Sequence, residues 1–327
     1  MSSIATAPEV TSAVAYEAVQ GLSATPKTLT PWLFYDEAGS HLFEQITTLP
    51  EYYLTRTERS IFAKHADEIL AQAAGEHHLT LVELGAGTAT KTGILLAAAV
   101  RRQTNVVYQP VDVSQTALDE ARDNIETHIP GVMVLSQVAD YTSEPLKLKR
   151  QPGVRTLALY IGSSIGNFAP NDALEVLQIL RSQLRPGDSL LLGTDLAKDE
   201  ATLLAAYNDA SGVTAAFNLN VLTRLNRELG ANFRLENFAH KSIWNAAESR
   251  IEMHLESTVS QRVHIPANAS CPALTIDFAP GETIHTENSY KFTATSVGSL
   301  LQSAGFTSVR TWNDPNNLFA VTLAEAS

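Results

Sequence analysis

Two glycines and two acidic residues in the first third of the chain have the types and spacing that bind a nucleoside. Gly85 and Gly87 follow a short apolar run, and Glu83 stands two positions before Gly85. Asp112 ends a second apolar run at 106–112. Glycine lets the backbone approach a ligand where a Cβ would clash. An acid at the tip of the second strand is placed to accept hydrogen bonds from both ribose hydroxyls of an adenosine.

The spacing departs from the dinucleotide-binding fingerprint at one position. That pattern requires a third glycine at position 90, where this chain has Thr90. The departure disfavours an NAD-dependent oxidoreductase, and it favours a nucleoside cofactor without a pyrophosphate. A glycine pair between a strand and a helix also occurs in ordinary tight turns, so the interpretation depends on Glu83 and Asp112.

Polar residues that could bind a substrate occur at two further places. Gly162 and Asn167 follow an apolar run at 155–161, where the carboxyl end of a parallel strand would present them to a ligand. Glu287 and Ser289 are two residues apart in an extended stretch and therefore point to the same side. A carboxylate can accept one imidazole N–H while a hydroxyl serves the other nitrogen, which favours a histidine side chain. The alternative is a solvated strand edge.

These residues, together with several longer motifs, resemble a known family. The stretches 83–87, 112, 140–141 and 184–188 are similar to class I S-adenosylmethionine (SAM)-dependent methyltransferases. The chain also resembles one branch of these enzymes, the histidine Nα-methyltransferases, which form hercynine on the route to ergothioneine. This resemblance lies in the stretches 34–40, 49–58, 162–168 and 287–292. The resemblance covers almost the whole chain from about Pro31, and it implies transfer of three methyl groups from SAM to the α-amine of L-histidine.

The resemblance also implies roles for individual residues. In the substrate site it implies that Phe43 and Met253 line the pocket and that Asn167 and Tyr207 bind the carboxylate. Glu287 and Ser289 would contact the imidazole, and Gly162 would lie in the same site. Tyr35 and Tyr52 would be the catalytic tyrosines near the amine. In the cofactor site it implies that Gly85, Gly87 and Lys91 contact the methionine end. Asp112 would contact the ribose, and Asp140 and Tyr141 would contact the adenine. No metal is implied, and the scattered His240, His254 and His264 predict none.

The elements that would position these residues alternate between strands and helices. Apolar runs predict strands at 79–84, 106–112, 132–138, 155–161, 189–194, 308–312 and 318–323. The alternation predicts an α/β fold, a Rossmann-like methyltransferase sheet with helices on both faces. Thr55 and Glu58 have the spacing of a capping box that opens a helix.

The chain between the fifth strand and the last helix is too long for a loop and predicts a second α+β domain. Within it, 199–230 has helical spacing, and Ile251, Met253 and Leu255 would share one face of a strand. We expect residues 76–198 and 293–327 to form the SAM-binding core and 199–292 to form an inserted substrate-binding domain. Residues 1–75 would contribute to that substrate domain.

Composition narrows the function further. The 327 residues carry a formal net charge of −12 and no basic run, which disfavours a nucleic-acid substrate. The single cysteine, Cys271, excludes an internal disulfide. The N-terminus lacks a signal-peptide pattern, so we expect a cytoplasmic protein. No apolar run could span a bilayer, so we expect no binding to a membrane. We also expect a monomer. Three other functions stay open: an N-methyltransferase of a tryptophan-derived amine, the NAD-dependent oxidoreductase that Thr90 disfavours, and a non-catalytic SAM-binding module.

Overall fold

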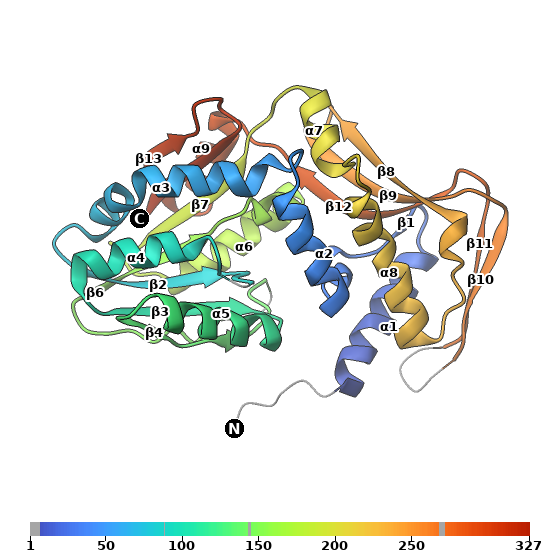
Figure 1. Ribbon diagram of the computed structural model, residues 1–327, viewed down its shortest axis with the longest axis horizontal. Coiled ribbons are helices and arrows are strands. Elements are labelled where there is room, and N and C mark those ends of the chain that lie inside the picture. The colour runs from blue at the N-terminus through green and yellow to red at the C-terminus, as the bar shows by residue number, and fades with distance from the viewer. Residues whose placement is uncertain (1–6, 88, 143–144, 268–271) are drawn as a thin grey trace. The chain divides into compact units, whose positions relative to one another are not determined.

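The computed structural model describes residues 7–87, 89–142, 145–267 and 272–327 (Figure 1). Cys271 lies outside these residues. The chain divides into two compact units, each formed from two segments. The first unit comprises Met1–Tyr53 and Lys198–Ser289, and the second comprises Leu54–Ala197 and Tyr290–Ser327. By this division residues 54–75, which the sequence analysis grouped with the substrate domain, belong to the second unit.

An eight-stranded sheet forms the centre of the second unit, in the order β13-β14-β7-β6-β2-β3-β4 with β5 also paired to β3. The strands are β2 (His78–Leu84), β3 (Val106–Asp112), β4 (Val132–Val134), β5 (Gln137–Val138), β6 (Val154–Tyr160), β7 (Ser189–Asp195), β13 (Phe306–Asn313) and β14 (Phe319–Ala326). All pairings from β4 to β7 are parallel, whereas β14 is antiparallel to both β7 and β13. The predicted α/β sheet is confirmed, although the predicted strand at 132–138 is interrupted between β4 and β5.

Helices cover both faces of this sheet because successive side chains of a strand point to opposite faces. Val82 and Leu84 lie in one core together with apolar residues of α6 (Pro170–Gln183) and α9 (Ala294–Ser303). Glu83 points to the opposite face, where Thr92 of α4 (Thr92–Gln103) donates a hydrogen bond to it. The ribbon shows α3 (Tyr53–Ala74), α4 and α5 (Gln115–His128) around that second face (Figure 1).

One predicted feature of α3 is wrong. The helix begins at Tyr53, two residues before Thr55, so Thr55 and Glu58 do not form a capping box at its start. The Glu58 side chain is fully buried and is bound to Lys91 and to the backbone of Gly162. A carboxylate held by partners elsewhere in the fold is not available to its own helix terminus.

A smaller four-stranded sheet, in the order β1-β12-β9-β8, forms the first unit together with a two-stranded sheet of β10 and β11. These strands are β1 (Lys27–Thr28), β8 (Phe238–Asn245), β9 (Arg250–Ser257), β10 (Gln261–Ile265), β11 (Leu274–Phe278) and β12 (Thr283–Tyr290). The helices of this unit are α1 (Ala7–Ser23), α2 (Glu37–Thr48), α7 (Glu200–Tyr207) and α8 (Val213–Leu229). Ile251, Met253 and Leu255 are all buried, which confirms that they share the inward face of one strand.

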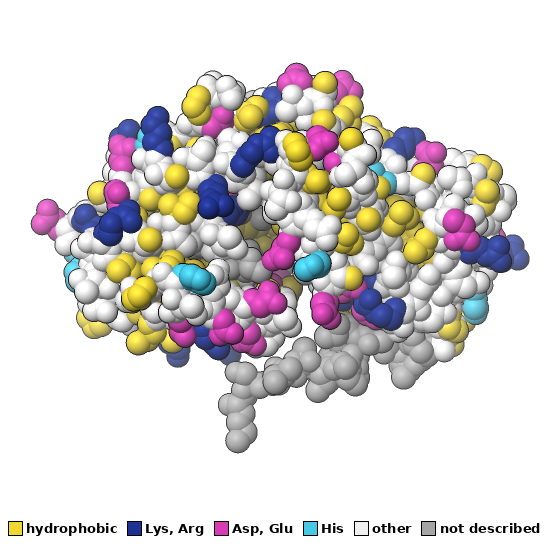
Figure 2. All heavy atoms as spheres, viewed as in Figure 1, with side chains coloured by type: hydrophobic (Ala, Val, Ile, Leu, Met, Phe, Trp, Pro, Cys, Tyr) yellow, Lys and Arg dark blue, Asp and Glu magenta, His cyan; other side chains and the backbone are white. Residues whose placement is uncertain are grey.

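None of the described helices combines the length and the apolar composition that a bilayer crossing needs. Figure 2 shows Lys and Arg side chains dispersed among acidic ones over the face it draws. Among the described residues visible on that face, the cations do not gather into a stripe of the kind that tracks a phosphate backbone.

Candidate functional site

The glycine turn after β2 leaves open space beside its backbone. Gly85 and Gly87 have φ of 63° and 52°, the left-handed region that favours glycine. A Cβ placed on Gly87 would meet no heavy atom within 4 Å. The Asp112 carboxylate lies against this turn, since Gly87 N–H donates to its Oδ2 at 3.0 Å. An open backbone next to a carboxylate suits the sugar of a nucleoside, so these residues fit SAM.

Asp112 also shapes the start of the next helix. Its Oδ1 accepts a hydrogen bond from Ser114 N–H at 2.9 Å. Ser114 is the N-cap of α5, and its side-chain oxygen accepts from Ala117 N–H at 3.2 Å. Both carboxylate oxygens of Asp112 are therefore oriented by backbone amides, and each retains further acceptor capacity for a ligand.

Tyr141, one of the two predicted adenine residues, lies close to the same turn. The Tyr141 hydroxyl would be 3.3 Å from a Cβ on Gly85, and its ring packs edge-on against Tyr160 with centroids 5.7 Å apart. Burial raises the pKa of the Tyr141 hydroxyl to about 12, so the group stays protonated. Asp140 is exposed and accepts hydrogen bonds from the backbone and hydroxyl of Thr142. Their contact with an adenine stays a prediction.

Glu58, which was predicted to cap a helix, instead binds two residues of the predicted site. Its Oε2 lies 2.6 Å from Lys91 Nζ, and its Oε1 accepts from Gly162 N–H at 2.8 Å. Gly162 has φ of 80°, and a Cβ there would lie 2.9 Å from Lys91 Nζ, so a larger residue would displace the lysine. A single buried carboxylate thus fixes the predicted methionine-end lysine and the predicted substrate-site glycine together. In the sequence, the only signal for this role of Glu58 was its place in the motif at 49–58, which resembles the family.

Glu83 is a buried acid beneath the glycine turn. Thr92 Oγ1 donates to both of its oxygens, at 2.8 and 2.7 Å, and the Tyr108 hydroxyl donates to Oε2. Burial raises the pKa of Glu83 to about 7, against the lowering effect of these hydrogen bonds and of Lys91. The protonated form is therefore favoured in the folded protein well above the pH at which an exposed glutamate ionises.

A pH-dependent stability follows from this raised pKa. The stability contributed by Glu83 is fully present below about pH 4.5 and is lost as the pH rises through about 7. Glu83→Gln removes this dependence while keeping an acceptor for Thr92 and Tyr108. Between pH 5 and 7.5 the free energy of unfolding of the wild type should fall relative to the variant by about 2 kcal/mol. Urea unfolding at both pH values measures this, and a constant difference between the two proteins would contradict it.

The predicted residues of the first unit form a connected aromatic cluster. The Phe43 ring contacts those of Tyr35 and Tyr52, with centroids 5.7 and 6.3 Å apart. The Tyr52 ring in turn lies 6.3 Å from that of Tyr207. The Tyr207 hydroxyl and Ser289 Oγ share a hydrogen bond of 2.6 Å. Side chains that are up to 254 positions apart in the chain, from Tyr35 to Ser289, are thus linked within one unit.

The remaining predicted substrate residues have different surroundings. Met253 is buried on β9, and its carbonyl accepts from the Thr286 hydroxyl at 3.0 Å. Glu287 is half-buried on β12, two residues before Ser289. Asn167 ends the short helix η2 (Ser164–Asn167) after β6, in the second unit with Gly162. The substrate roles of all these residues stay predictions.

Phe217 is a cluster member that the sequence analysis did not single out. This α8 residue packs its ring against those of Tyr35, Phe43 and Phe34, with centroids 5.8, 6.0 and 4.6 Å apart. Its helical spacing marked it only as apolar, and spacing does not separate a pocket wall from an ordinary core position.

Asp36 and Gly39, two residues of the motif at 34–40, have specific structural roles. Its carboxylate caps α2 by accepting from Gly39 N–H at 2.8 Å. The same carboxylate accepts from Asn220 and Arg227 of α8, each at 2.7 Å. A Cβ on Gly39 would lie 1.7 Å from the Phe34 carbonyl oxygen, so only glycine fits there. The motif therefore joins α2 to α8, and these two helices carry Phe43 and Phe217.

Comparisons with known proteins give a matching family model and several similar relatives. The model of a family described as "Histidine-specific methyltransferase, SAM-dependent" matches residues 14–326. The chain is similar to the histidine N-alpha-methyltransferase of Mycolicibacterium smegmatis, with 45% identity over 93% of this chain and 92% of the relative. It is 43% identical to that of Mycobacterium tuberculosis, over the same shares. A third relative, "Ergothioneine biosynthesis protein 1" of Neurospora crassa, is 33% identical over 64% of this chain and 24% of its own length.

Proposed function

Since this chain belongs to the SAM-dependent, histidine-specific methyltransferases, we propose that it methylates the α-amine of L-histidine three times and forms hercynine for ergothioneine biosynthesis. The observation that carries the proposal is the linkage of Tyr207 and Ser289 to the aromatic cluster of Tyr35, Phe43 and Tyr52. The names of the two mycobacterial relatives support the choice of histidine and of its α-amine.

In this proposal the second unit holds SAM, which supplies an electrophilic methyl group on a sulfonium. Asp112 would bind the ribose hydroxyls, and Lys91, held by Glu58, would bind the carboxylate of the methionine end. The open backbone at Gly87 would let that end approach closely. These contacts orient the cofactor and need no covalent bond to the protein.

The first unit would hold the amino acid. Glu287 would accept an imidazole N–H and Ser289 would serve the other ring nitrogen, while Tyr207 would bind the carboxylate. The hydroxyls of Tyr35 and Tyr52 would accept hydrogen bonds from the neutral amine and direct its lone pair. Aromatic faces also tolerate the positive charge that the nitrogen gains as it becomes a quaternary ammonium.

The reaction is tested by incubating the protein with labelled SAM and each amino acid in turn. We expect label to enter histidine, with mass spectrometry showing the mono-, di- and trimethylated products. Label in tryptophan or a tryptophan-derived amine, with none in histidine, would replace this proposal by the rival methyltransferase. Binding of S-adenosylhomocysteine without turnover of any amine would indicate a non-catalytic module.

Glu287→Ala is expected to lower kcat/KM for histidine by about 10- to 100-fold, because a hydrogen bond to a charged group contributes about 1.5–3 kcal/mol. Steady-state kinetics with histidine and with tryptophan measures the change, and the preference for histidine should fall by a similar factor. Glu256→Ala serves as the control, since Glu256 lies on β9 and pairs with Lys241 at 2.6 Å. Equal effects of the two substitutions would rule out recognition of the imidazole by Glu287.

We also propose that the enzyme acts as a monomer in the cytoplasm. The net charge of −12 keeps copies of the chain apart, which supports this state. Light scattering after size-exclusion chromatography gives the oligomeric state, and fractionation of cells gives the location.

A further inference from the structure

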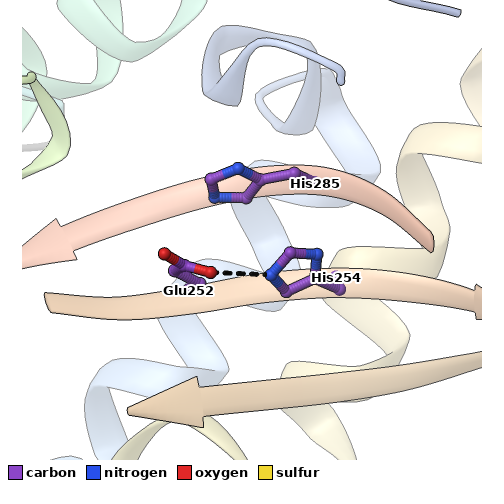
Figure 3. Close-up of side chains that lie close together, drawn as sticks. All are labelled: Glu252, His254 and His285. Atoms are coloured by element: carbon purple, nitrogen blue, oxygen red, sulfur yellow. Dashed lines mark hydrogen bonds and ion pairs between the residues drawn. The ribbon is translucent and has the colours of Figure 1, made fainter. Parts of the chain in front are cut away.

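Three side chains on the four-stranded sheet converge at a place that the proposed reaction does not use. Glu252 and His254 lie on β9, and His285 lies on its neighbour β12, with all three side chains on the same face of the sheet (Figure 3). One nitrogen or carboxylate oxygen from each residue lies within 4.8 Å of those of the other two. We propose that these residues bind a divalent transition-metal ion, for which Zn²⁺ is the best match.

The three ligand groups are of the kinds that bind zinc. Two imidazoles and one carboxylate are a ligand set that binds Zn²⁺ and leaves a fourth position for water. Zinc–ligand distances of about 2.0–2.2 Å place tetrahedral ligand atoms about 3.3 Å apart. The three groups therefore need to approach one another by about 1.5 Å at most, starting from the 4.8 Å limit. The terminal torsion of histidine is soft, so the rings can turn toward an ion without a backbone shift.

The surroundings of Glu252 are the second argument, because they orient one of its oxygens toward the histidines. Arg250 and Asn245 donate to Oε1, at 2.8 Å from Arg250 Nε and 2.9 Å from Asn245. Oε2 lies 3.1 Å from His254 Nε2. Partners of this kind fix the direction of a ligating carboxylate in metal sites.

The two histidines are the third argument. Their rings stack with centroids 4.6 Å apart and an interplanar angle of 19°. His254 Nδ1 is buried without a hydrogen-bond partner among the described residues. His285 Nε2 lies 3.1 Å from the Glu287 carbonyl oxygen, a contact typical of the outer shell of a metal-binding histidine.

Binding of the metal alone tests the proposal without any methyl transfer. Titration calorimetry of the chelator-treated full chain with Zn²⁺ should show one site per chain. His254→Gln, His285→Gln and Glu252→Gln should each weaken binding by more than about tenfold. His264→Gln, at an exposed histidine of β10, is the matched control and should leave the affinity unchanged.

Co²⁺ gives a second readout, because its visible absorption distinguishes a four-coordinate site from a hydrated ion. The wild type and His264→Gln should develop the intense four-coordinate spectrum, and the other three variants should not. Because His254 is buried, the half-buried His285 and Glu252 carry the test if its variant does not fold. No saturable binding by the wild type, or equal loss in the control, would overturn the proposal.

Discussion

Asp112→Ala is expected to weaken S-adenosylhomocysteine binding by more than about 100-fold. The carboxylate is predicted to accept two ribose hydroxyls, and each hydrogen bond to a charged group contributes about 1.5–3 kcal/mol. The variant also removes the acceptors of Gly87 N–H and Ser114 N–H, so the turn that faces the cofactor loses its support. Titration calorimetry measures the dissociation constant directly.

Two further variants make the Asp112 experiment specific. Asp112→Asn keeps one oxygen acceptor and should bind the ligand with intermediate affinity. Asp119→Ala removes a largely exposed acid of α5, seven residues away in the chain, and should change the dissociation constant by less than about twofold. Binding by Asp112→Ala within threefold of the wild type would exclude the ribose assignment, provided that its thermal unfolding remains cooperative.

Lys291→Met is expected to lower the free energy of unfolding by about 3–5 kcal/mol. Lys291 Nζ lies 2.8 Å from Asp195 Oδ2, and both side chains have no solvent exposure. Without the lysine, the aspartate at the end of β7 would be a buried charge that has lost its counter-ion. Urea unfolding monitored by circular dichroism gives the change.

The exposed pair of Lys241 and Glu256 is the matched control for this experiment. Its atoms are 2.6 Å apart, but the two side chains are 49% and 30% exposed, so Lys241→Met should cost less than about 1 kcal/mol. Replacing both members of the buried pair, as Lys291→Met with Asp195→Leu, should recover much of the lost stability, because no charge is then left unpaired. Similar losses in the two single variants would show that burial of the pair is not the cause.

The core sheet was predictable because its strands carry a strong local signal. The stretch at 106–112 is rich in Val and Tyr, and β3 has the same limits in the structure. Ser114 was recognisable as a cap because its hydroxyl acts on an amide only three residues away. The strand predicted at 132–138 was less accurate, since pairing with β3 and not composition decides where β4 and β5 stop.

The cofactor and substrate residues were named partly from spacing and partly from resemblance. Gly85, Gly87 and Asp112 follow the strand–turn–helix pattern, and the structure places them together. The bond between Tyr207 and Ser289 joins residues 82 positions apart, and no local pattern predicts such a contact. Only the resemblance had grouped those two residues.

Residues whose environment comes entirely from tertiary packing were missed. Thr55 and Glu58 satisfied a local rule, but Glu58 is used by Lys91 and Gly162, which lie 33 and 104 positions further along the chain. His254 was interpreted as one of several scattered histidines, and His285, 31 positions further along the chain, was not considered with it. They become neighbours only through the adjacency of β9 and β12.

The two-segment construction of the first unit has a consequence for recombination between relatives. Asp36 comes from the N-terminal segment, whereas its partners Asn220 and Arg227 come from the later one. The parallel pairing of β1 with β12 joins the same two segments. A chimera that exchanges only residues 198–289 would combine a foreign α8 with a native Asp36. The substrate preference of a relative should therefore be transferred only when residues 1–53 and 198–289 are exchanged together.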